Sequence, residues 1–131
     1  MNNQKNISKK VLLVDDEPDI LEFMSYNFRK CGFSVSTALN GREGIACAQA
    51  ETPDIIVSDI LMPVMDGIQM CILLREDTNL KNTPFLFLTA VTDDYKVLYA
   101  MTSGADQFVS KPIRFEALLS MVNELLEAPA A

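Results

Sequence analysis

The chain has 131 residues, enough for one domain with a hydrophobic core but too few for two domains of ordinary size. Its net charge of −7 argues against nucleic-acid binding through its own surface, and the lack of histidine excludes imidazole catalysis and the usual zinc sites. No apolar run approaches the roughly 18 residues of a membrane span. We therefore expect a cytoplasmic protein, and we interpret its three cysteines as reduced packing residues.

Short apolar runs alternate with helical patterns along the chain. In chain order we expect a strand at 11–14, a helix at 18–30, a half-exposed strand at 33–38, a helix at 41–50, a strand at 55–57, a helix at 67–75, a strand at 85–88, a helix that Thr92 or Asp93 caps and that ends at Ser103, a strand at 107–109 and a helix at 114–127. Strict alternation of five strands and five helices predicts an α/β domain with an all-parallel five-stranded sheet and helices on both faces.

A short segment at each end of the chain is expected to lie outside the folded domain. Residues 1–9 are interpreted as a polar tail, and residues 128–131 as either a tail or the start of a linker. The folded domain is therefore expected to span 10–127.

Two of the expected strands run directly into carboxylates. Asp15 and Asp16 follow the first strand, and Asp59 follows the third. Ligands of parallel sheets bind at the carboxyl ends of the strands, where Thr89 and Lys111 also fall. Because like charges repel unless a cation lies among them, and because oxygen ligands suit hard cations, this edge predicts a Mg²⁺ site that could also take Mn²⁺.

Such a site could perform phosphoryl transfer. One aspartate would act as the nucleophile, while the metal, the ammonium of Lys111 and the hydroxyl of Thr89 would offset the charge of the phosphoryl group.

The order and spacing of these residues closely resemble the receiver domain of two-component response regulators, over residues 10–126. The shared motifs are Asp15-Asp16, Asp59 with the following Met62-Pro63-Val64-Met65-Asp66-Gly67, Thr89-Ala90, and Gly104-Ala105-Asp106 leading to Phe108 and Lys111-Pro112. The resemblance implies the flavodoxin-like strand order 2-1-3-4-5, and a cis bond between Lys111 and Pro112.

The resemblance also implies roles for the site residues. Asp59 would accept a phosphoryl group from a sensor histidine kinase or phosphotransfer protein. Asp15, Asp16, Asp59 and the carbonyl of Leu61 would bind Mg²⁺, while Lys111 and Thr89 would contact the phosphoryl oxygens. Thr89 and Phe108 would then move and change the surface formed by the fourth helix, fifth strand and fifth helix. The domain would act as a switch rather than an enzyme, although it would assist its own phosphorylation and dephosphorylation.

Two surfaces are expected to bind partners. Ile20 and Phe23 lie beside the buried face of the first helix, formed by Leu21, Met24 and Phe28, so we expect them to be partly exposed and to dock the kinase. Residues 115–127 of the fifth helix include no basic residue, which argues against the symmetric dimer common in this family. We expect the isolated domain to be largely monomeric and to use Tyr95, Lys96 and Tyr99 toward an output domain or partner that the sequence does not identify.

Leu61 and Val91 depart from the family pattern, since many relatives carry polar residues at these positions. As apolar groups at the rim of the site they would shield the phosphoryl group from water and slow its hydrolysis.

Three alternative functions are less well supported. A haloacid dehalogenase-like aspartyl-phosphate hydrolase needs a second aspartate two residues after its nucleophile, which Asp15-Asp16-Glu17-Pro18 lacks. A flavodoxin-like cofactor binder needs a phosphate-binding loop after the first strand, where this chain is acidic. A pseudo-receiver would bind partners without phosphorylation, although all five site residues are present.

Overall fold

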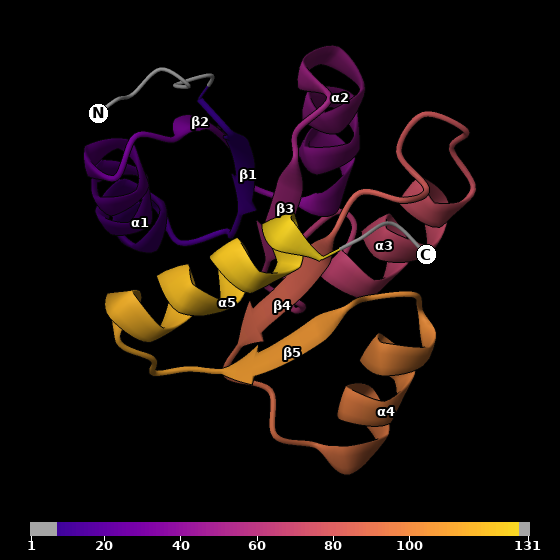
Figure 1. The fold of residues 1–131 in the computed structure, drawn as a ribbon. Coiled ribbons are helices and arrows are strands. Elements are labelled where there is room, and N and C mark those ends of the chain that lie inside the picture. Colours follow the sequence, from indigo (N-terminus) through magenta and orange to yellow (C-terminus); the bar gives the residue numbers. More distant parts are fainter. Residues whose placement is uncertain (1–7, 129–131) are drawn as a thin grey trace.

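The computed structural model describes residues 8–128 as a three-layer α/β domain (Figure 1). Its elements are β1 Lys10–Val14, α1 Pro18–Lys30, β2 Ser34–Ala38, α2 Gly41–Glu51, β3 Ile55–Ser58, α3 Gly67–Arg75, β4 Phe85–Thr89, α4 Asp94–Thr102, β5 Gln107–Ser110 and α5 Phe115–Glu127. All strand pairs are parallel, and the strand order is β2-β1-β3-β4-β5. The predicted fold class and strand order are therefore confirmed. Residues 1–7 and 129–131, which include most of the two expected end segments, lie outside the described residues.

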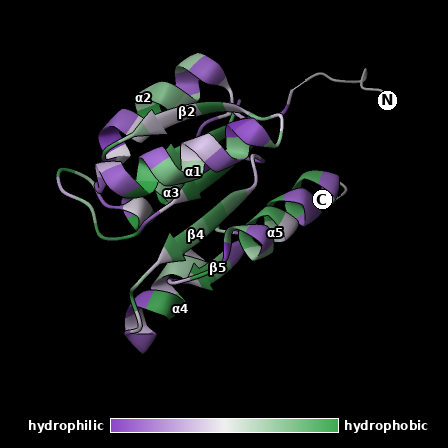
Figure 2. Ribbon diagram, turned by 90° about the vertical axis from the view of Figure 1, so that its left-hand side faces the viewer, coloured by the Kyte–Doolittle hydropathy of each residue, from purple (hydrophilic) through white to green (hydrophobic). Residues whose placement is uncertain are grey.

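Alternation along the central strands produces two cores, one on each side of the sheet. In β1, Val11 and Leu13 pack with α1 and α5, whereas Leu12 and Val14 pack with the helices of the other face. The ring of Phe28 meets those of Phe33 and Phe115 edge to face, at centroid distances of 5.2 and 4.9 Å, and so joins α1 to α5. Figure 2 shows β4, between these layers, coloured as hydrophobic along its length.

Local side-chain chemistry sets several helix ends. The side chain of Asp93, and not that of Thr92, caps α4 by accepting hydrogen bonds from the amides of Tyr95 and Lys96. Arg114 has extended backbone angles and precedes α5 instead of opening it. The other bounds differ from the predicted ones by a residue or so. The strands extend into polar residues such as Ser58 because ladder pairing depends on the backbone and not on hydrophobicity.

The cysteine prediction is partly wrong. Cys71 is buried and Cys47 half-buried, but Cys31 is exposed at the end of α1. No disulfide is present among the described residues, and no helix of residues 8–128 is long and apolar enough to cross a membrane.

The start of α3 lies against the backbone of Asp59. The amide of Gly67 donates to the carbonyl of Ile60 at 2.8 Å, and a Cβ at Gly67 would overlap the Asp59 carbonyl oxygen. Gly32 differs, because its φ of +95° disfavours a side chain although a Cβ would meet no atom within 4 Å.

Gly67→Ala should therefore lower the free energy of unfolding by about 2–4 kcal/mol, because backbone must move to relieve the overlap. Gly32→Ala is the matched control and should cost only about 1 kcal/mol, since it adds conformational strain alone. Urea unfolding of both variants measures the difference. A smaller loss at Gly67 than at Gly32 would contradict this account of the close approach.

Candidate functional site

Strand register brings the three aspartates together. Val14 pairs with Ser58 across β1 and β3, so the next residues, Asp15 and Asp59, follow at the same level of the sheet. One carboxylate oxygen from each of Asp15, Asp16 and Asp59 lies within 4.8 Å of the others. Asp15 is buried, Asp59 is half-buried and Asp16 is exposed, so the cluster opens to solvent on one side.

Lys111, from the loop between β5 and α5, reaches into this cluster. Its Nζ lies 2.9 Å from Oδ2 of Asp15 and 3.3 Å from Oδ2 of Asp59. Burial acts to lower the pKa of the Lys111 ammonium, but the hydrogen bond to Asp15 and the charges of Asp59 and Asp15 outweigh it, so the pKa is raised. The side chain therefore stays charged at neutral pH. The bond between Lys111 and Pro112 is cis, as expected.

Backbone amides fix the other oxygens of the two inner carboxylates. Oδ1 of Asp15 accepts a hydrogen bond from the amide of Glu17 at 2.9 Å, and Oδ1 of Asp59 accepts one from the amide of Ile60 at 2.6 Å. Each inner aspartate is thus held between an amide and Lys111. These two amides could not be predicted from the sequence, because any residue type except proline can supply a backbone N–H.

The charges of the cluster favour a divalent cation. Three carboxylates and one ammonium give a formal charge of −3 + 1 = −2. The ligands available are all oxygens, and one side is open to solvent, which suits a Mg²⁺ ion because it retains several waters. The residues present therefore fit a magnesium ion.

Thr89 lies at the carboxyl end of β4, next to β3 in the sheet. Its carbonyl accepts a hydrogen bond from the amide of Lys111 at 2.8 Å, so the two are joined through the backbone. The Thr89 hydroxyl is buried and accepts a long hydrogen bond of 3.3 Å from the amide of Val91. Within residues 8–128, no side-chain hydrogen bond links Thr89 to the carboxylates.

The remaining predicted residues lie at varied depths. Phe108, on β5, is half-buried and packs against the core on the α2 and α3 side of the sheet. Leu61 is 55% exposed, as a rim residue should be. Val91 is not at an exposed rim as expected, because its side chain is buried in that same core.

An apolar hollow of about 410 Å³ adjoins Lys111 between α1 and α5. Ile20 is half-buried and Phe23 is 61% exposed, and both line this hollow, in agreement with the predicted exposure. Pro112 and Ile113 line it too. These two residues were not among the predicted surface residues, although an apolar pair directly after a site lysine is a signal in the sequence.

Comparisons with known proteins agree with this geometry. The family model described as the response regulator receiver domain matches residues 11–123. The chain is 35% identical over 120 residues to the alkaline phosphatase synthesis transcriptional regulatory protein PhoP of Bacillus subtilis. The match covers 92% of this chain and 49% of PhoP. It is 39% identical over 126 residues to the hybrid signal transduction histidine kinase D of Dictyostelium discoideum, covering 95% of this chain and 8% of that protein.

Solved structures of similar length match as well. The chemotaxis response regulator CheY4 of Vibrio cholerae superposes with a TM-score of 0.84 at 36% identity, covering 90% of this chain and 98% of CheY4. The chain spans about half the length of PhoP and less of the hybrid kinase, so these relatives carry further regions outside the match. Fold, site and family model agree, and the chain belongs to the response regulator receiver domain family.

Proposed function

We propose that this receiver domain, spanning residues 10–127, accepts a phosphoryl group on Asp59 from a histidine kinase or phosphotransfer protein in the cytoplasm. The observation that carries the proposal is the convergence of three carboxylates around one lysine. A domain selected for stability alone would not place these like charges together, because each repels the others. The domain would act as a switch rather than an enzyme, although it would assist its own phosphorylation and dephosphorylation.

In the reaction, an oxygen of Asp59 forms the new bond to phosphorus as the bond from phosphorus to the donor imidazole nitrogen breaks, and that nitrogen keeps the electron pair. The amide of Ile60 holds Oδ1 of Asp59 in place, which leaves Oδ2 beside the Lys111 ammonium. Lys111 is already within hydrogen-bond distance and can transfer its interaction to a phosphoryl oxygen. Asp15, Asp16, Asp59 and the Leu61 carbonyl would hold Mg²⁺ or Mn²⁺, which when bound offsets the charge of the phosphoryl oxygens.

Phosphorylation would add close to one negative charge and new acceptor oxygens at Asp59. The long hydrogen bond that the Thr89 hydroxyl accepts is weak, so Thr89 can exchange it for a bond donated to the phosphoryl group. Phe108 lies on the neighbouring strand and would fill the space that Thr89 leaves. The change would reach the surface formed by α4, β5 and α5.

The two partner surfaces follow from exposure and charge. Ile20 and Phe23, with Pro112 and Ile113, form an apolar wall beside Lys111 that a kinase helix could cover while presenting its phosphohistidine. On the output face, Tyr95 is 87% exposed and Tyr99 56%. Lys96 is exposed between them. Because α5 has no basic residue with which to form pairs across a symmetric dimer, this surface would contact a partner or output domain and not a second copy. The isolated domain would then be largely monomeric and would not touch nucleic acid directly.

Asp59→Asn should abolish labelling by acetyl phosphate in the presence of Mg²⁺, because an amide oxygen cannot supply the nucleophilic carboxylate. Intact-mass measurement should show one added phosphoryl group on the wild type and none on the variant. Asp94→Asn, which removes an exposed carboxylate on α4, should label like the wild type. Full labelling of the Asp59 variant would refute the assignment, and an unlabelled wild type would favour the pseudo-receiver.

Asp16→Asn tests the metal site without relying on phosphorylation. In chelator it removes one repelling charge while both ion pairs of Lys111 remain, so the free energy of unfolding should rise by up to about 1 kcal/mol. With Mg²⁺ the wild type should become the more stable of the two proteins. Its free energy of unfolding should rise by about 2.7 kcal/mol at a Mg²⁺ concentration 100 times the dissociation constant, while that of the variant should rise less because the variant binds the ion more weakly. Urea unfolding with and without Mg²⁺ measures both effects, and equal gains would exclude Asp16 as a ligand.

A further inference from the structure

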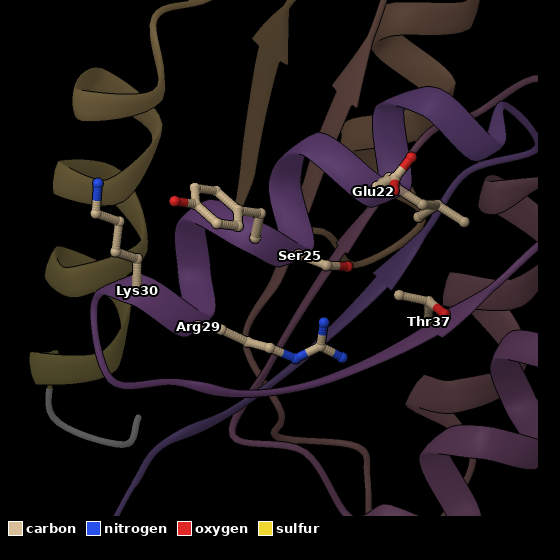
Figure 3. Close-up of a pocket in the computed structure, with 7 residues that line it drawn as sticks. Glu22, Ser25, Arg29, Lys30 and Thr37 are labelled. Carbon is tan, nitrogen blue, oxygen red and sulfur yellow. The ribbon is translucent and has the colours of Figure 1, made fainter.

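The open edge of the sheet, at β2, lies beside a hollow that the phosphorylation site does not use. β2 pairs with β1 on one side and is the last strand of the sheet on the other. A hollow of about 640 Å³ lies between this strand and α1 (Figure 3). Its lining includes Glu22, Ser25, Tyr26, Arg29, Lys30 and Thr37. An open strand edge beside a hollow is the arrangement in which an extended peptide can add to a sheet.

The backbone pairing shows which groups of β2 are available. The amide of Ser34 donates to Lys9 and the carbonyl of Ala38 accepts from Asp15, so the alternate residues Ser34, Ser36 and Ala38 face β1. In a parallel ladder the residues between them direct their N–H and C=O groups the other way. Val35 and Thr37 therefore present backbone donors and acceptors to the open edge.

Arg29 covers part of this edge through a weak contact. Its Nη2 lies 3.4 Å from the carbonyl oxygen of Val35, near the limit of a hydrogen bond. Figure 3 shows the side chain running from the end of α1 along β2 toward Thr37. A carboxylate would bind this guanidinium more strongly than a neutral carbonyl does, because the bond would be charge-assisted and could be bidentate.

Lys10, Arg29 and Lys30 outnumber Glu22 and Glu51, the two acidic residues that line the same hollows, so the edge has a small excess of positive charge although the chain carries −7. Within residues 8–128 the ion pairs are those of Arg75 and Lys111, so the side-chain cations of Arg29, Lys30 and Lys10 form no ion pair. The backbone amide of Lys10 donates to Oδ2 of Asp54 at 2.7 Å. The Nζ of Lys30 lies 5.7 Å from the centre of the Tyr26 ring, and that of Lys10 donates to the carbonyl of Glu51. These cations surround the β2 edge and favour an anionic partner.

The other face of the same edge has a smaller hollow, of about 140 Å³, lined by Lys10, Ser34, Val35, Ser36 and Glu51. Alternate side chains of an added strand point to opposite faces of the sheet. One set would enter the hollow beside Arg29, and the other would meet the two serines, where only small residues fit.

We propose that β2 is a docking edge for an extended acidic peptide segment of a partner protein, which adds to the sheet as a sixth strand. Its backbone pairs with Val35 and Thr37, its carboxylates bind Arg29 and Lys30 on the α1 face, and its small residues lie against Ser34 and Ser36. A second copy of this chain fits less well, because antiparallel pairing about a twofold axis would bring two Arg29 side chains together.

The test is a titration of the ¹⁵N-labelled protein with the peptide acetyl-Thr-Glu-Thr-Glu-Thr-Glu-Thr-amide, followed by amide chemical shifts. Shifts should concentrate at 34–38 and at the end of α1. Two N-methylated versions of the same peptide are compared, one methylated at the odd residues and one at the even residues. At least one of them should bind far more weakly, since it cannot complete the ladder of backbone hydrogen bonds. A Thr-Lys peptide of equal length should not bind.

Arg29→Glu should weaken binding of the Thr-Glu peptide at least about tenfold. Arg42→Glu, which reverses an exposed arginine on α2, is the matched control and should leave the affinity unchanged. Equal binding of the Thr-Lys peptide, unchanged affinity of the Arg29 variant, or shifts confined to another surface would each overturn the proposal. Self-association through β2 without peptide, seen by sedimentation and by concentration-dependent shifts at 34–38, would overturn it in favour of a second copy.

Discussion

The ammonium of Lys111, held between Asp15 and Asp59, is the interaction on which the site depends. Parallel strands in register force the two carboxylates to the same edge, and Asp16 follows directly. Without a cation these charges would repel one another and drive the strand ends apart. The lysine and the two backbone amides hold the inner pair, yet the cluster still carries a formal charge of −2 and remains open to a metal ion and a phosphoryl group.

The same lysine joins the site to the part of the domain that is proposed to respond. Its backbone amide donates a hydrogen bond to the carbonyl of Thr89. A change at Asp59 that moves Lys111 would therefore affect the ends of both β4 and β5. The neighbouring helix α4 is held lightly, since Ala100 is its one buried residue. A helix with so little buried surface can shift at small free-energy cost, which is what a surface switch requires. The central strands β3 and β4, by contrast, are buried along their whole length.

Much of this could be predicted from sequence because the signals are local or periodic. Apolar runs located every strand to within a residue or so, and carboxylates at two strand ends indicated the site once the sheet was taken as parallel. Errors arose where side-chain type does not determine position. Val91 is buried although it lies two residues beyond β4, and Cys31 is exposed because it lies one residue beyond α1. The amide of Ile60 and the reach of Arg29 to Val35 depend on tertiary geometry that no pattern of residue types encodes.

A double-mutant cycle between Lys111 and Asp59 tests the central claim most directly, with the free energy of unfolding measured in chelator for the wild type, Lys111→Gln, Asp59→Asn and the double variant. In the wild type, Asp59→Asn loses both attraction to the lysine and repulsion from its neighbours, so its effect should be small. In the Lys111→Gln background it removes repulsion alone and should stabilise the domain. We expect a coupling free energy of about 1–2 kcal/mol. If the changes in unfolding free energy of the two single variants add up to that of the double variant to within about 0.3 kcal/mol, Lys111 does not hold the carboxylates together.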